Sequence, residues 1–109
     1  SSVFDLLSSQ RETKLAAIEP ILRSFPDRRF ILVGDTGEQD PEIYSQLARE
    51  NPDQIAAIYI RNATGEDPSD SRFEDAFREL PKTRFVLFDE ATEVEASIVA
   101  LLNELDGTR

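Results

Sequence analysis

An uninterrupted apolar run at residues 55–60 places the strongest constraint on what this chain can fold into. Residues that favour turns flank the run, and it is too short for a helix, so it is predicted to be a β-strand. Because no polar residues alternate with the apolar ones, helices should cover both faces of this strand, as in a parallel sheet. Residues 29–33 and 84–88 are predicted to form two further strands.

Helical periodicity surrounds these three runs. Apolar residues recur every three or four positions over residues 10–24, after Pro41, over residues 73–80 and from Val94 onwards. The expected order is therefore α-β-α-β-α-β-α, and helical crossovers between strands require a parallel sheet with right-handed connections. We predict an α/β fold with a three-stranded parallel sheet and flanking helices, forming a single domain over residues 1–109.

Capping patterns predict where three of the helices begin. The patterns Ser9-x-x-Glu12 and Thr92-x-x-Glu95 are possible capping boxes for the first and the last helix. Asp40 is expected to cap the second helix, because the proline that follows it is favoured at a first helical position.

The composition limits what the chain can bind. Its 109 residues contain 22 acidic and 12 basic side chains, a net charge of −10, and neither cysteine nor histidine. The negative charge argues against unaided binding to nucleic acid or to an anionic membrane. A metal ion could be held only by oxygen ligands, which favours a hard cation such as Mg²⁺. No apolar run approaches the roughly 20 residues of a membrane span, and no signal peptide is recognisable, so a cytoplasmic location is expected.

Three carboxylates follow the first predicted strand within a few residues. In open α/β sheets, ligands bind beyond the carboxyl ends of the strands. Asp35 is therefore predicted to bind Mg²⁺, with Glu38 and Asp40 as further ligands or as partners of metal-bound water. The plainer alternatives are that Asp40 is only a helix cap and that Glu38 is only a solvated carboxylate.

Two cationic side chains could join this edge of the sheet. Lys14 lies near the start of the first helix and could reach a phosphate there, although a solvated surface lysine is the simpler alternative. Arg61 follows the second strand and could contact Asp35, Glu38 or a phosphate, or form a structural ion pair elsewhere.

These residues carry a resemblance to the catalytic domain of actin-patch-associated phosphatidate phosphatases and their bacterial relatives, within the haloacid dehalogenase superfamily. The resemblance covers about residues 4–88 and is carried by the strings Glu12-Thr-Lys14, Phe30-Ile-Leu-Val-Gly-Asp-Thr-Gly-Glu-Gln-Asp-Pro-Glu-Ile-Tyr44 and Ala57-Ile-Tyr-Ile-Arg61. It implies that Lys14 neutralises the phosphoryl group, that Asp35 is the metal-binding aspartate of the fourth motif, and that Asp40 is the second acid of that motif. It also implies Mg²⁺-dependent phosphomonoester hydrolysis through an aspartyl-phosphate, with a phosphorylated small molecule or lipid headgroup as substrate.

One departure from the superfamily pattern lowers the expected activity of the chain. The nucleophile and the general acid of the superfamily belong to an Asp-x-Asp motif after a first strand, and residues 1–109 contain no such motif. The nearest candidate, Asp67-Pro-Ser-Asp70, has the wrong spacing. We therefore expect an incomplete haloacid-dehalogenase-like Rossmannoid fold, the C-terminal half of a phosphatase domain, inactive without the N-terminal half. The outer edge of the first strand should then be unpaired or covered by another chain, which allows self-association.

A non-catalytic acidic module, such as a receiver-like regulatory domain, is the alternative. A receiver has five strands, an acceptor aspartate and a distal lysine, whereas three strands are recognisable in this sequence.

Overall fold

The computed structural model describes residues 3–107, with side chains from residue 9 onwards. Its elements follow the predicted order, and the α/β class is confirmed: α1 (Val3–Ser24), β1 (Phe30–Asp35), α2 (Asp40–Glu50), β2 (Ile55–Arg61), α3 (Ser71–Ala76), β3 (Arg84–Phe88), the 3₁₀ turn η1 (Ala91–Glu93) and α4 (Glu95–Gly107). In the part of the chain that the structure describes, no helix combines the length and the apolar character that a membrane span requires.

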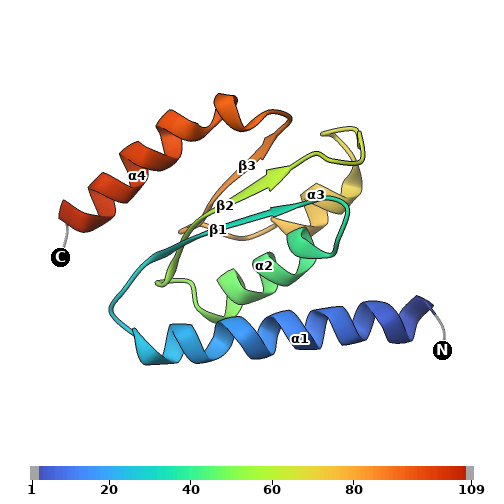
Figure 1. Cartoon of the computed structure of the whole chain (residues 1–109), viewed down its shortest axis with the longest axis horizontal. Helices are drawn as coiled ribbons and strands as arrows, with labels where there is room; N and C mark the ends of the chain where they lie inside the picture. The colour runs from blue at the N-terminus through green and yellow to red at the C-terminus, as the bar shows by residue number, and fades with distance from the viewer. Residues whose placement is uncertain (1–2, 108–109) are drawn as a thin grey trace.

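The sheet is parallel and has the strand order β1-β2-β3, which makes β2 the central strand. Helices α1, α2 and α3 lie on one side of the sheet and α4 on the other (Figure 1). Every residue of β2 except its last, Arg61, is buried. The prediction that both faces of this strand are covered is therefore confirmed.

From Ala57 to Ile60, alternate residues of β2 enter two different apolar cores. Ile58 and Ile60 pack with α1 and α2, whereas Ala57 and Tyr59 pack with α4 and the segment before it. This alternation is the expected geometry of a strand, in which successive side chains point to opposite faces. The first core is the larger, and its other buried members are Leu22, Ile43, Tyr44, Leu47, Ala48 and Ile55.

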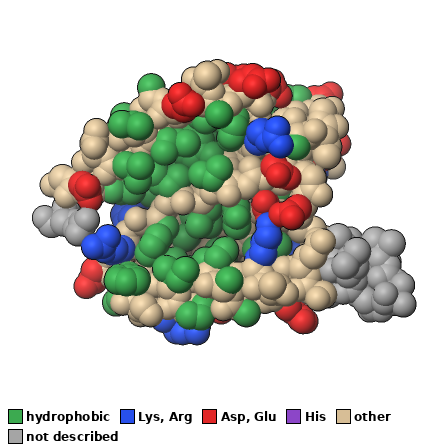
Figure 2. All heavy atoms as spheres, viewed as in Figure 1, with side chains coloured by type: hydrophobic (Ala, Val, Ile, Leu, Met, Phe, Trp, Pro, Cys, Tyr) green, Lys and Arg blue, Asp and Glu red, His purple; other side chains and the backbone are tan. Residues whose placement is uncertain are grey.

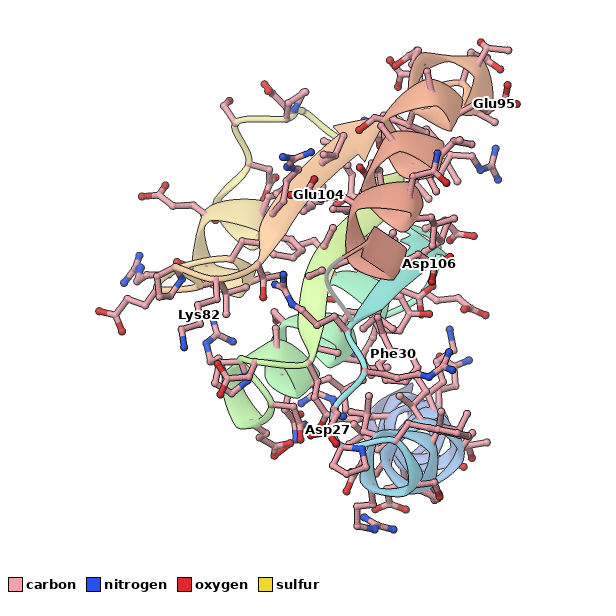
Figure 3. All side chains as sticks on the ribbon, turned by 90° about the vertical axis from the view of Figure 1, so that its left-hand side faces the viewer. Asp27, Phe30, Lys82, Glu95, Glu104 and Asp106 are labelled. Carbon is pink, nitrogen blue, oxygen red and sulfur yellow. The ribbon has the colours of Figure 1, made fainter. Side chains whose placement is uncertain are left out.

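The outer edge of β1 pairs with no strand among residues 3–107, because β1 is hydrogen-bonded to β2 alone. The predicted open edge is therefore confirmed. Apolar side chains gather on this side of the molecule, between α4 and α1 (Figure 2). In the view turned by 90°, Phe30 at the start of β1 lies between these two helices (Figure 3). Val33 is 55% exposed, so part of the apolar surface of β1 faces solvent.

Both predicted capping boxes are wrong. Helix α1 begins at Val3, so the Ser9-x-x-Glu12 pattern lies inside it, and the helix continues through Pro20 to Ser24. Residues 3–8, which precede the pattern, contain neither glycine nor proline. The helix can therefore extend towards the N-terminus beyond Ser9. Before α4, the backbone N–H of Glu90 donates to the carboxylate of Glu93 at 3.1 Å, which caps the turn η1 instead.

Two further element ends differ from the predictions. Strand β1 extends to Asp35, because pairing with β2 continues through Gly34 and Asp35. Helix α3 ends at Ala76, short of the predicted residue 80. The guanidinium of Arg49 donates to the carbonyl oxygens of Asp75 and Ala76 at the end of the shortened helix, and to that of Arg78 just beyond it.

Candidate functional site

The end of β1 and the start of α2 approach each other at Gly34 and Asp40. The Oδ2 atom of Asp40 accepts a hydrogen bond from the backbone N–H of Asp35 at 3.1 Å. A Cβ atom built on Gly34 would lie 2.4 Å from that same Oδ2 atom. Only glycine therefore allows Asp40 to come this close to the strand.

Asp40 is not the helix cap that the sequence predicts. Gln39 occupies the capping position without a side-chain hydrogen bond, and Asp40 is the first residue of α2. Its side chain turns back towards β1 and is only 3% exposed. Two groups draw the carboxylate of Asp40 away from the N-terminal end of α2: the amide of Asp35 and the amino group of Lys14. A buried carboxylate is stable only when it is both hydrogen-bonded and paired with a positive charge.

Lys14 reaches this carboxylate from α1. Its Nζ atom donates to Asp40 Oδ1 and to Glu38 Oε2. Partial burial acts to lower the pKa of Lys14, but the hydrogen bonds to Asp40 and Glu38 outweigh burial, and the net shift is upward. Lys14 is therefore charged at neutral pH, and the alternative of a freely solvated surface lysine is wrong.

Asp35 stands beside this ion pair without joining it. Its Oδ1 atom accepts the backbone N–H of Gly37 at 2.8 Å. Asp35 is partly exposed, so its carboxylate is open to a ligand from solvent. Mg²⁺ is commonly held by one or two carboxylates together with waters and substrate phosphate, so Asp35 fits as one such ligand.

The other two predicted ligands are engaged with Lys14. Among residues 3–107, no group of three or more carboxylates is arranged to hold a metal ion. Both oxygens of Asp40 have protein partners, whereas Glu38 is exposed and has one oxygen bonded to Lys14. The residues fit a cation held by Asp35 more closely than one held by all three carboxylates, and the metal assignment stays a prediction.

Arg61 lies next to Asp35 across the sheet, because the two residues are partners in the β1–β2 register. Its carbonyl oxygen accepts the backbone N–H of Thr36 at 3.0 Å. Within the described chain its side chain forms no ion pair with Asp35 or Glu38. The structure therefore leaves its guanidinium exposed at the edge where the site lies.

Two residues near the site were missed by the sequence analysis. The hydroxyl of Tyr44 donates to the carbonyl oxygen of Val33 at 3.3 Å, and its pKa is raised by burial and by the charge of Asp40. Arg72 of α3 binds the loop between β1 and α2. No local pattern could have identified Arg72, because its partners in that loop are 34 and 36 residues away in sequence.

Comparison with known proteins gives matches in the part of the chain that contains this site. The family model described as "Phosphatidate phosphatase APP1, catalytic domain" matches residues 1–62. The chain is 45% identical over 67 residues to the phosphatidate phosphatase APP1 of Saccharomyces cerevisiae, which covers 59% of the chain and 11% of that protein. It is 41% identical over 49 residues to an uncharacterized protein of Schizosaccharomyces pombe, covering 45% of the chain and 8% of that protein. The chain thus matches only about a tenth of the length of these relatives, and no solved structure matches it significantly.

Proposed function

This chain belongs to the family of the phosphatidate phosphatase APP1 catalytic domain, and on that premise we propose that it forms the lysine- and cation-bearing part of a Mg²⁺-dependent phosphomonoester phosphatase. The observation that carries the proposal is the position of Lys14. Its amino group is fixed by Asp40 and Glu38 beside Asp35, at the carboxyl edge of a parallel sheet. Phosphatidate, or another phosphomonoester on a lipid or small molecule, is the proposed substrate class.

In this proposal Lys14 binds the phosphoryl group. A charged amino group that is already held in place can stabilise the negative charge that develops on the phosphoryl oxygens, without reorganising during the reaction. Asp40 holds Lys14 in its charged form and ties it to the end of β1 through the amide of Asp35. Asp40 is therefore assigned to positioning the lysine.

Asp35 is the proposed ligand of Mg²⁺, and Glu38 would contact a water of the metal ion. Bound there, the metal ion would supply neutralisation of phosphoryl charge and orientation of the substrate. The hydrogen bond from Gly37 keeps the Asp35 side chain at the end of β1.

The nucleophile in this proposal lies outside residues 1–109. Since these residues contain no Asp-x-Asp motif, an aspartate from another segment would attack phosphorus while the bond to the leaving oxygen breaks. The leaving oxygen then takes a proton from an acid, and water hydrolyses the aspartyl-phosphate. Such a segment could lie along the open edge of β1, which has no strand partner among residues 3–107.

The first experiment measures hydrolysis of a chromogenic phosphomonoester. We expect no turnover by the 109-residue chain alone, and Mg²⁺-dependent turnover by a longer polypeptide that includes a segment with the nucleophile. In the active polypeptide, Lys14→Met should lower kcat by about 100-fold or more. Lys82→Met is the matched control, because among the described residues the side chain of Lys82 forms an exposed ion pair with Asp53 and lies away from the site. Turnover by the chain alone would refute the assignment of the nucleophile.

Treatment with an acyl-phosphate donor separates this proposal from a receiver-like module. A receiver would gain a phosphoryl group on an aspartate, and mass spectrometry would detect it. We expect no phosphorylation, in keeping with the three strands formed by residues 3–107.

A further inference from the structure

Arg72 links α3 to the loop between β1 and α2, which carries Glu38 and joins Asp35 to Asp40. The residue lies in the first turn of α3 (Ser71–Ala76), and its side chain is 23% exposed. We propose that Arg72 is a positioning residue, whose guanidinium fixes the conformation of the loop 36–39 and thereby the orientation of Asp35 and Glu38. The consequence for cation binding rests on the function proposed above, whereas the effect on the loop does not.

The guanidinium holds the loop at two backbone points. Its Nη1 atom donates to the carbonyl oxygen of Thr36 at 3.0 Å, and its Nη2 atom donates to the carbonyl oxygen of Glu38 at 2.8 Å. These two carbonyl groups lie on either side of Gly37, a residue that imposes little conformational restriction of its own. Contacts from outside Gly37 therefore restrict the conformation of this loop, and the guanidinium of Arg72 supplies one on each side of it.

The same guanidinium is anchored to two carboxylates. It binds Glu42 of α2 in a bidentate manner, through Nε to Oε2 at 2.8 Å and Nη2 to Oε1 at 2.9 Å. Its Nη1 atom also donates to Glu66 at 2.7 Å. Together with the two carbonyl groups this makes five hydrogen bonds, which equals the number of N–H donors on an arginine side chain. A lysine has three donors and no planar fork, so it cannot replace this arrangement.

The network continues into the loop after β2. Glu66 accepts a hydrogen bond from the hydroxyl of Thr64 at 2.7 Å, and the hydroxyls of Thr64 and Thr36 are 2.8 Å apart. Thr36 is buried, so this end of the loop is held by both its side chain and its carbonyl group. Arg72 thus joins the loops after β1 and β2 to α2.

The anchored loop sets two contacts of the site. Gly37 donates its N–H to Asp35, and Glu38 places its carboxylate on Lys14. Both contacts depend on the peptide groups between the two carbonyls that Arg72 holds. Without that anchor, the carbonyl groups of Thr36 and Glu38 lose their guanidinium contacts, and we expect Asp35 and Glu38 to sample other orientations.

Hydrogen exchange measured by NMR on the full 109-residue chain tests the positioning role. In Arg72→Lys, the protection of the Gly37 amide should fall by about tenfold or more, the equivalent of one lost hydrogen bond. This loss of protection at Gly37 should be larger than the loss of protection at the amides of β2, whose exchange reports global unfolding. Arg78→Lys is the matched control, because the side chain of Arg78 has no ion-pair partner among the described residues except the exposed carboxylate of Asp75. Equal falls at Gly37 and in β2, or no fall at Gly37, would overturn the proposal.

A titration with Mg²⁺ alone, followed through the amide shifts of Asp35 and Glu38, tests the consequence for the site. If the wild-type chain binds Mg²⁺, Arg72→Lys should weaken the affinity by about tenfold, as expected for a residue that orients a ligand. An Arg72→Lys chain that binds Mg²⁺ as tightly as the wild type would overturn the proposal. If the wild-type chain binds no Mg²⁺, the metal assignment of Asp35 fails, and the exchange measurement still decides the role of Arg72.

Discussion

Replacement of Gly34 by alanine tests the close approach of β1 and α2 on which the site depends. The new Cβ atom would lie 2.4 Å from Oδ2 of Asp40 and 2.7 Å from its Cβ and Cγ atoms. The carboxylate has no free space to move into, because it is buried and binds both Lys14 and the amide of Asp35. Since the Cβ atom of Asp40 moves only with its backbone, relief of the clash requires α2 to shift away from β1.

The expected cost follows from two contributions. Overpacking of a well-packed site costs about 1–3 kcal/mol. Separation of Asp40 from the amide of Asp35 removes a hydrogen bond to a charged acceptor and costs about 1.5–3 kcal/mol more. Gly34→Ala should therefore lower the free energy of unfolding by about 2.5–6 kcal/mol, a large part of the roughly 5–15 kcal/mol of a typical domain.

Urea unfolding followed by circular dichroism measures this change. Gly107→Ala is the matched control, because among the described residues a Cβ atom there would meet no atom within 4 Å beyond the backbone of its own helix. In an Asp40→Gly background, which removes all three clashing atoms, Gly34→Ala should cost less than about 1 kcal/mol, since neighbouring sites are not additive. A loss below about 1 kcal/mol for Gly34→Ala in the wild-type background would refute the close-approach argument.

Three further predictions concern other parts of the molecule. The pKa of Glu66 is lowered by hydrogen bonds from Thr64 and Arg72, so Glu66 stabilises the fold above its unfolded pKa near 4.5, and this contribution is lost as the pH falls through the lower folded pKa. The difference in unfolding free energy between wild type and Glu66→Gln should therefore shrink below about pH 4.5 in urea titrations, and a difference that grows on acidification would contradict this. Tyr59→Phe removes the 2.8 Å hydrogen bond to Ser97 and should cost about 1 kcal/mol in thermal unfolding, whereas an unchanged melting temperature would argue against that bond. Val33→Lys places a charge on the open edge of β1 and should reduce any concentration-dependent self-association seen by sedimentation, while equal association in both proteins would place the contact elsewhere.

Much of the fold could be predicted from local sequence. The apolar run at residues 55–60 identified a strand buried on both faces, because a strand with one solvated face would alternate polar and apolar residues. The helical periodicity between the strands then required parallel pairing, since antiparallel neighbours need no helical crossover. These properties depend on residues close together in the chain, and a sequence displays them directly.

The resemblance identified Lys14, Asp35 and Asp40 as residues of one site, and the structure brings them to the same edge of the sheet. Their contacts could not be predicted. Lys14 is 26 residues from Asp40 in the chain, and whether a lysine is solvated or paired depends on how α1 packs against α2. The burial of Asp40, and its turn towards β1 in place of capping α2, follow from that packing.

What the sequence alone determined is the type and order of the elements, the parallel sheet, and the residue types from which a cation and phosphate site can be built. Only the tertiary structure decided that β2 is the central strand, that Asp40 holds Lys14, and that Arg72 fixes the loop after β1. The physical reason is the separation along the chain of the residues that interact. Secondary structure follows from the spacing of neighbouring side chains, whereas the partner of a charged group is chosen by which distant segments packing brings within hydrogen-bond distance.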